Sequence, residues 1–567
     1  MSLIETKSGK LQLGTFRKAI IWGVIASLFA YLIGHLFYMQ VYAPDRLIQE
    51  GNNRVVRHYS YEPPRGYIVD RNGKILALSI PVKEVNADPK KLHESGVYQD
   101  KDAMNQLASL LDIDIKVLYK KTKNPKKRFV NLKHYLDFDK ASSVKAICPE
   151  GLILVDTYKR YYPTGKVNAP LVGILNGEGA GIYGVEQSFN SYLSSHAQLD
   201  KANKDRYNHI VENLGTVQKG NQGGNLILSV DQRLQDLAYQ KLEEAVTSNE
   251  ADSGCAVLVD VKTGEVLAMV TSPSFDPNDR THFDSNNAKN RTITDTFEPG
   301  STLKPIVALA ALESKATSWN EVFDTRPFIV DGKTVRDSHA MQSGTLKDII
   351  QYSSNTGMAR LSMRIGPHKV LKMVENFGFG HKSGTYLVGE SSGKLNANRS
   401  FWSKIDEATL GFGYGISVTT AQLASAYATL ASGGYRRPIS VLKTIKPQEG
   451  AQIVNHRQIK YMMNALETVV SEGTGGKAAI ERYRVAGKTG TAKIAKSGGY
   501  SNEYVSTFAG FAPISDPRFA LVVVISAPKA GQFYGGVVSG PVFRDVMSHA
   551  LQIYNIKPDR QIENSQQ

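Results

Sequence analysis

A serine and a lysine whose chemistry could be combined lie three positions apart, directly before a strongly apolar run. Ser301 and Lys304 belong to the segment FEPGSTLKP, which IVALAALESK follows. The Pro-Gly pair predicts a helix start at Ser301, and residues three apart share one face of a helix. Serine is a poor nucleophile by itself, but a lysine that burial keeps uncharged can accept its proton. The pair therefore predicts nucleophilic catalysis by Ser301.

The Ser-x-x-Lys spacing alone is weak, because it also begins at Ser142, Ser391, Ser440 and Ser526. Pro or Gly interrupts the matches at Ser391 and Ser526, and Ser440 follows a proline in an extended-looking run. Ser142 is compatible with a helix but lies in a basic region near the N-terminal apolar segment. Only Ser301 opens a strongly apolar helix.

Two further groups follow along the chain. Ser353 and Asn355, in DIIQYSSNTGMARL, could relay a proton to a leaving amine and hold a peptide group. The alternative is that they only break or cap helices. The third group, in the strand-like run YRVAGKTGTAKI, combines a fixed positive charge, hydroxyls for a substrate carboxylate and a glycine that allows close backbone approach. Its members are Lys488, Thr489, Gly490 and Thr491.

Taken in this order, Ser-x-x-Lys, Ser-x-Asn and Lys-Thr-Gly form the signature of serine enzymes acting on penicillin-like and D-alanyl-D-alanine substrates. The sequence resembles the penicillin-binding proteins and serine β-lactamases, and most closely the class B penicillin-binding proteins of the division-specific FtsI type. The segment from Arg65 to Gly73 (RGYIVDRNG) and Gly184-Val185-Glu186 look like motifs of that family's pedestal domain. The segment from Gly411 to Gly434 is similar to the division-specific type.

The resemblance implies peptidoglycan D,D-transpeptidation. Ser301 would form an acyl-enzyme with a stem peptide, Lys304 would accept its proton, and Ser353 would protonate the leaving D-alanine. Lys488 would supply positive charge, while Asn355, Thr489, Gly490 and Thr491 would bind substrate. The backbone N–H groups of Ser301 and Thr491 would form the oxyanion hole. β-Lactams would acylate Ser301 too, and neither a metal nor an organic cofactor is expected.

Composition and charge limit the remaining possibilities. The 567 residues carry 68 Lys and Arg against 53 Asp and Glu, a net charge of +15 that suits an anionic neighbour. Eight basic residues crowd between Lys116 and Lys133, but without a nucleic-acid motif we interpret them as a solvated face. The only cysteines, Cys148 and Cys255, cannot build a disulfide scaffold or a four-cysteine zinc site.

An uncharged run of 23 residues, 19–41, is long enough to cross a bilayer as a helix and exceeds the apolar core of a signal peptide. Arg17 and Lys18 precede it and favour a cytoplasmic N-terminus. We therefore expect a single-pass inner-membrane protein with a periplasmic catalytic domain. The expected organisation is a cytoplasmic tail (1–18), a transmembrane helix (19–41), a pedestal (42–222), a transpeptidase domain (223–555) and a tail (556–567).

The expected fold class is α+β. Strand-like runs at both ends of the C-terminal domain, with helices between them, predict an antiparallel sheet covered by helices. The resemblance specifies five strands and an elongated, mostly β pedestal. The polar, glycine-ended stretch 200–224 is interpreted as a linker.

The partners implied are stem peptides ending in D-Ala-D-Ala, β-lactam antibiotics, an FtsW-type glycosyltransferase and other divisome proteins, with no nucleic acid. The alternatives are an elongation-specific class B transpeptidase and a divisome scaffold with secondary enzymatic activity. A β-lactamase or carboxypeptidase would use water as acceptor, and a bifunctional class A enzyme would need an E-D-x-x-F motif that the sequence lacks.

Overall fold

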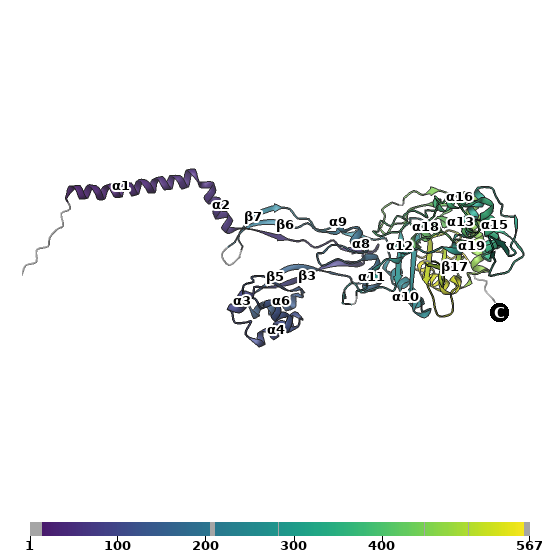
Figure 1. The fold of residues 1–567 in the computed structure, drawn as a ribbon, viewed down its shortest axis with the longest axis horizontal. Coiled ribbons are helices and arrows are strands. Elements are labelled where there is room, and N and C mark those ends of the chain that lie inside the picture. Colours follow the sequence, from purple (N-terminus) through teal and green to yellow (C-terminus); the bar gives the residue numbers. More distant parts are fainter. Residues whose placement is uncertain (1–13, 205–209, 282, 447, 497, 561–567) are drawn as a thin grey trace, which may run out of the picture. The chain divides into compact units, whose positions relative to one another are not determined.

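The computed structural model describes residues 14–204, 210–281, 283–446, 448–496 and 498–560. They belong to two compact units, whose elements are labelled in Figure 1. The first unit combines Met1–Pro63 with Ser195–Asn221, and the second combines Pro64–Ser194 with Gln222–Gln567. Residues 1–13 of the expected cytoplasmic tail and 561–567 of the expected C-terminal tail lie outside the described residues.

The first unit begins with the apolar helix that the sequence predicts. Helix α1 spans Thr15–Phe37 and continues as the π-helical turn η1, Tyr38–Tyr42. The mean hydropathy of its most apolar window is 2.0, and none of its side chains is buried by the protein. Its length and composition are sufficient to span a membrane.

The prediction of a linker at 200–224 is wrong. The chain instead forms β6 (Gln198–Lys204) and β7 (Ile210–Gln218), which pair with β1 (Val56–Tyr61) in the order β1-β6-β7. Helix α2 (Pro44–Val55) precedes this sheet. The described residues of β7 are exposed, so the strand lacks the hydrophobic alternation that reveals a strand in a sequence.

Residues 64–194 and 222–228 of the second unit contain a second small sheet and a helical lobe. The long strand β3 pairs antiparallel with β2, β4 and β5, while β8 lies parallel to β2. These strands are β2 (Ile68–Val69), β3 (Ile75–Ala87), β4 (Val130–Leu136), β5 (Leu152–Tyr161) and β8 (Leu226–Ile227). The helices are α3 (Pro89–Glu94), α4 (Lys101–Leu111), α5 (Ile115–Thr122), α6 (Phe138–Ile147), η2 (Gly165–Val167), α7 (Ala169–Val172), α8 (Gly184–Ser188) and α9 (Asn190–Leu193).

The two motifs of this region meet through one buried carboxylate. Glu186 is fully buried, and its two oxygens accept hydrogen bonds of 2.7 Å from Arg65 Nε and from Arg160 Nε. Arg65 also donates to the Asn190 and Ser194 side chains. A buried carboxylate needs such pairing, so Arg65 and Glu186 fix the two segments against each other.

The main sheet is antiparallel and has the order β10-β9-β19-β18-β17. Strands β9 (Ser253–Asp260) and β10 (Val266–Ser272) form the predicted hairpin, with Gly264 at φ +77° in its turn. Strands β17 (Ala486–Lys496), β18 (Gly499–Ala512) and β19 (Phe519–Ser526) come from the other end of the domain. The prediction of a sheet assembled from both ends is confirmed, and β17 forms one edge.

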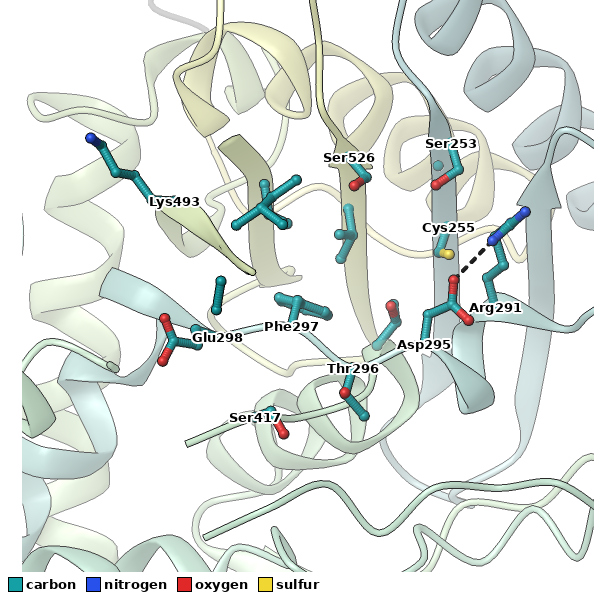
Figure 2. A pocket seen from close by; sticks show the side chains of 16 residues that line it. Ser253, Cys255, Arg291, Asp295, Thr296, Phe297, Glu298, Ser417, Lys493 and Ser526 are labelled. Carbon is teal, nitrogen blue, oxygen red and sulfur yellow. Dashed lines mark hydrogen bonds and ion pairs between the residues drawn. The ribbon is translucent and has the colours of Figure 1, made fainter. Parts of the chain in front are cut away.

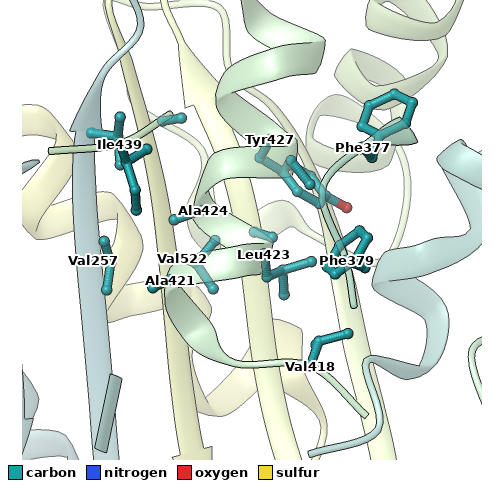
Figure 3. Packing of buried hydrophobic residues seen from close by; sticks show 14 of the residues in the cluster. Val257, Phe377, Phe379, Val418, Ala421, Leu423, Ala424, Tyr427, Ile439 and Val522 are labelled. Carbon is teal, nitrogen blue, oxygen red and sulfur yellow. The ribbon is translucent and has the colours of Figure 1, made fainter. Parts of the chain in front are cut away.

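Alternate residues of the strands face two hydrophobic cores. One face packs on α10 (Gln232–Ser248), which Asp231 caps, and on α21 (Gly540–Ile553). The other packs on α18 (Thr420–Ala431), whose Ala421 and Ala424 lie beside Val522 of β19, while Leu423 and Tyr427 point toward Phe379 and Phe377 (Figure 3). This second core contains the hydrophobic helix that follows Ser301.

The remaining elements lie between β10 and β17 or close to the C-terminus. They are α11 (Ser285–Ala288), α12 (Arg291–Thr294), η3 (Gly300–Leu303), α13 (Lys304–Glu313), β11 (Val322–Asp324), β12 (Phe328–Val330), β13 (Lys333–Val335), β14 (Ser343–Thr345), α14 (Leu346–Gln351), α15 (Asn355–Ile365), α16 (Pro367–Asn376), α17 (Lys404–Leu410), β15 (Tyr435–Arg436), β16 (Ala451–Gln452), α19 (His456–Ser471), η4 (Gly476–Ala478) and α20 (Gly535–Val538).

Candidate active site

Three groups of residues far apart in the sequence meet at a cavity of about 450 Å³. Its walls include Ser301 from η3, Ser353 and Asn355 at the start of α15, and Thr489 and Thr491 from β17. Lys304 and Lys488 are fully buried behind them. Gly490 lets β17 approach the serine turn, because a Cβ there would lie 2.8 Å from Thr302 Cγ2.

Ser301 lies in the short 3-10 turn η3, immediately before α13. Gly300, at φ +54°, donates its N–H to the Gly413 carbonyl and directs the chain into this turn. Every residue from Lys304 to Leu312 is buried, so α13 anchors the turn in the core. The Ser301 N–H has no acceptor in the described part of the chain, so it is free to donate to a ligand.

The Lys304 ammonium joins the first and second motifs. Its Nζ donates to the Ser353 carbonyl at 2.5 Å, to Asn355 Oδ1 at 2.8 Å and to Ser353 Oγ at 3.1 Å. Burial, and then the nearby positive charge of Lys488, hold the pKa of Lys304 well below its ordinary value of 10.5, while Asp337 opposes this shift. A neutral amine has one lone pair, so Lys304 can accept a proton in this position.

Asp337 organises the second motif, although it belongs to none of the motifs that the sequence analysis identified. Its Oδ1 accepts from the N–H of Asn355 at 2.5 Å and from that of Thr356 at 2.8 Å, at the N-terminus of α15. Its Oδ2 accepts from the hydroxyls of Ser354 at 2.6 Å and Thr356 at 2.8 Å. A carboxylate is favourable at a helix N-terminus. Ser353 stands in the left-handed region, at φ +60°, where its carbonyl and its hydroxyl both face Lys304.

The third motif lies on the edge strand β17. Lys488 Nζ donates to the Thr489 carbonyl at 3.2 Å and to its hydroxyl at 3.4 Å. Burial lowers the pKa of Lys488 to about 7. The Thr489 hydroxyl also shares a 2.8 Å hydrogen bond with Thr474, and Thr491 Oγ1 accepts from Gly535 N at 3.0 Å. Thr474 is another site residue that the sequence motifs did not reveal.

Aromatic side chains complete the cavity walls. They are His339, Tyr352, Phe412, Tyr414 and Tyr534. The rings of His339 and Tyr352 stack at 4.6 Å, and Tyr414 packs edge-on against Phe412 at 5.7 Å. Among these, Phe412 and Tyr414 fall in the segment from Gly411 to Gly434 that the resemblance had singled out.

No cluster of three or more His, Cys, Asp or Glu residues able to hold a metal occurs among the described residues. What the cavity does contain is a serine hydroxyl, a buried lysine of lowered pKa and an unpaired backbone N–H on one side. Threonine hydroxyls line the other side. Such a site can accept an acyl group on serine, stabilise the oxyanion and hold a carboxylate.

The comparisons with known families agree with this geometry. The penicillin-binding protein transpeptidase domain family matches residues 254–548, and the penicillin-binding protein dimerisation domain family matches residues 60–228. The chain therefore belongs to the penicillin-binding protein transpeptidases.

Similarity to named relatives shows which type of penicillin-binding protein transpeptidase the chain is. The chain is 42% identical over 548 residues to the peptidoglycan D,D-transpeptidase FtsI of Escherichia coli K12, covering 96% of this chain and 93% of that one. It is 36% identical over 558 residues to FtsI of Buchnera aphidicola, covering 98% of both chains. It is a peptidoglycan D,D-transpeptidase of the division-specific FtsI type.

Solved structures show the same fold. A peptidoglycan synthetase from Bifidobacterium adolescentis has a TM-score of 0.70 at 23% identity, with 90% of this chain and 99% of that chain covered. Penicillin-binding protein 3 of Mycobacterium tuberculosis, crystallised with aztreonam, has a TM-score of 0.67 at 25% identity, with 88% and 98% covered.

Proposed function

We propose that Ser301 is the nucleophile of the transpeptidation and that Lys304 is its base. The observation that carries this proposal is the contact of the buried Lys304 amine with Ser353 and Asn355, in the cavity that Ser301 lines. Ser301 Oγ attacks the carbonyl of the penultimate D-alanine and its proton passes to Lys304. The N–H groups of Ser301 and Thr491 stabilise the oxyanion.

The second half of the step releases D-alanine. Ser353 Oγ, 3.1 Å from Lys304 Nζ, passes the proton to the leaving amine as the peptide C–N bond breaks. Thr489 and Thr491 hold the terminal carboxylate in the field of Lys488, with Gly490 allowing close approach, and Asn355 holds the peptide backbone. An amine of a second stem peptide then attacks the acyl-enzyme, loses a proton and forms the cross-link.

The location and the partners also belong to this proposal. The helix α1 anchors the chain, with the N-terminus in the cytoplasm and the catalytic domain in the periplasm. The family matches at 60–228 and 254–548 support a pedestal over 42–222 and a transpeptidase domain over 223–555. As the resemblance to the FtsI type implies, the protein works beside an FtsW-type glycosyltransferase and other divisome proteins. β-Lactams bind at Ser301, in line with the aztreonam complex of the mycobacterial protein.

The test is the intact mass of the full-length protein in detergent after incubation with a penicillin, followed by peptide mapping. We expect one stable adduct on the Ser301 peptide and no adduct in Ser301→Ala. An adduct on another residue would contradict the assignment of the nucleophile. No adduct together with hydrolysed antibiotic would indicate a β-lactamase instead.

A further inference from the structure

A second cavity, of about 340 Å³, lies at one end of the main sheet (Figure 2). Its floor contains Cys255 of β9, Val505 of β18 and Val524 of β19. Thr296 and Phe297, in the segment that leads to Ser301, form the opposite wall, and Lys493 of β17 lies at one side. This volume falls in the range typical of small-ligand sites.

Three chain segments contribute to both cavities. Glu298 lines the second cavity and Ser301 the first, Ser417 lines the second and Tyr414 the first, and on β17 Lys493 follows Thr491 by two residues. Because an extended chain spans at most about 3.5 Å per residue, three residues bridge no more than about 10 Å. The two cavities are therefore neighbours, within reach of one short extended peptide.

The position of Lys493 suits a peptide held along β17. If the terminal carboxylate of the donor lies at Thr489 and Thr491, the rest of an antiparallel donor strand runs toward Lys493. Two residues along β17 correspond to about two residues of the paired peptide. The residue that precedes the two D-alanines then lies beside Lys493.

The second cavity is lined by hydrogen-bonding groups that suit a peptide ligand. The hydroxyls of Ser253, Ser417 and Ser526 have no hydrogen-bond partner among the described residues, so they can meet amide groups. Lys493 Nζ likewise forms no ion pair within the described ranges. Cys255 is not a competing nucleophile, because burial raises the pKa of its thiol to about 12.

Charged groups around the second cavity determine which ligand charge it prefers. Asp295 is paired with Arg291 at 2.9 Å, and Glu298 Oε1 accepts from Gly415 N at 2.8 Å and from Tyr500 OH at 3.3 Å. Lys496, further along β17, is paired with Glu503 at 2.5 Å. Among the described residues that line the cavity, Lys493 is thus the cation without a carboxylate partner, and its charge is left for a ligand.

We propose that the second cavity is a subsite for the donor peptide and that Lys493 binds a carboxylate on the residue preceding the two D-alanines. This inference rests on the proposed function, because it assumes that the reacting carbonyl lies at Ser301. It adds a specificity determinant that acts two residues away from the scissile bond, through charge and not through the chemical step.

The test uses two N-acetyl tripeptides, X-D-Ala-D-Ala, in which X carries a side-chain carboxylate or the corresponding primary amide. Full-length protein is acylated by a fluorescent penicillin, and the concentration of each peptide that halves the acylation rate is measured. We expect the carboxylate peptide to compete about fivefold better than the amide, as for a partly exposed charged hydrogen bond. The quantity compared between variants is the ratio of the amide peptide's half-inhibitory concentration to that of the carboxylate peptide. Lys493→Gln should bring this ratio close to one, and Lys493→Glu should bring it below one.

Lys496→Glu is the matched control, because it places the same charge change on the same strand at a lysine that does not line the cavity. Its ratio should equal that of the wild type. Equal competition by both peptides in the wild type, or an unchanged ratio in Lys493→Glu, would overturn the inference, as would an absence of competition by either peptide. Failure of the penicillin to acylate Ser301 would instead refute the proposed function.

Discussion

Asp337 Oδ1 accepts a 2.5 Å hydrogen bond from the backbone N–H of Asn355, so a carboxylate from outside the three motifs holds the second motif in place. The same carboxylate acts on Lys304 through space, where its negative charge partly offsets the lowering of the lysine pKa. Asp337, which belongs to none of the three motifs, therefore both positions the second motif and influences the pKa of Lys304.

Asp337→Asn keeps the shape of the side chain and removes its charge. Because Asp337 raises the pKa of Lys304, its loss lowers that pKa further, so neutral Lys304 persists to lower pH. We expect the acidic limb of the pH profile for acylation by benzylpenicillin to move to lower pH. Asp348→Asn, at the capping box of α14, is the control that should leave the limb in place. A rate loss equal at all pH values would indicate a structural role only.

Lys488→Met should stabilise the fold while slowing acylation strongly. The pKa of Lys488 lies near 7 in the folded chain against 10.5 when exposed, so the unfolded chain binds more protons between these values. Burying Lys488 therefore destabilises most at and below pH 7, and this cost fades as pH rises to about 10.5. We expect Lys488→Met to add about 1–3 kcal/mol to the free energy of unfolding at pH 7 and to slow acylation about 100-fold. Urea unfolding at several pH values would measure this, and a gain that does not shrink with pH would contradict it.

Gly413 and Gly415 allow the effect of a steric contact to be separated from that of backbone strain. Both have positive φ, +86° and +79°, but a Cβ on Gly413 would lie 2.1 Å from the Gly300 carbonyl oxygen, whereas one on Gly415 meets no atom within 4 Å. Gly413→Ala should displace the turn before Ser301 and slow penicillin acylation more than about 100-fold. Gly415→Ala should cost only about 1 kcal/mol of stability, with acylation changed by less than about threefold. Equal effects of the two substitutions would show that backbone strain, not contact, decides.

Glu186→Ala should destabilise the second unit strongly. It would leave Arg65 and Arg160, whose side chains are 8% and 4% exposed, without their carboxylate. Breaking a buried ion pair costs about 3–5 kcal/mol, so the thermal midpoint should fall by several degrees. Lys372→Ala, which removes an exposed i,i+3 pair, should change stability by less than about 0.5 kcal/mol. A loss for Glu186→Ala as small as that of the control would exclude a stabilising role for the buried cluster.

Local patterns were sufficient to predict most of the main sheet and the residues that meet at the cavity. The strands β9, β10, β17, β18 and β19 are nearly continuous apolar or alternating runs, and Ser301, Ser353 and Lys488 begin recognisable motifs. Asp337 could not be predicted, because a lone aspartate acquires its role only when β13 and α15 pack together. Strands β6 and β7 were missed because β6 is mostly polar, the described residues of β7 are exposed, and their partner β1 lies far back in the chain.

The pairing of β9 with β19 has a consequence for how the protein reaches its native state. Val257 pairs with Val522, a separation of 265 residues (522 − 257), so the sheet cannot close until almost the whole chain has been synthesised. Until then β9 and β10, whose residues are nearly all buried in the native fold, have no β19 to cover them. Such non-local topology makes folding slow and leaves early intermediates prone to aggregation. A nascent chain stopped before β19 would thus be a substrate for chaperones or proteases, and any truncation ahead of residue 526 would remove the centre of the sheet and not merely its edge.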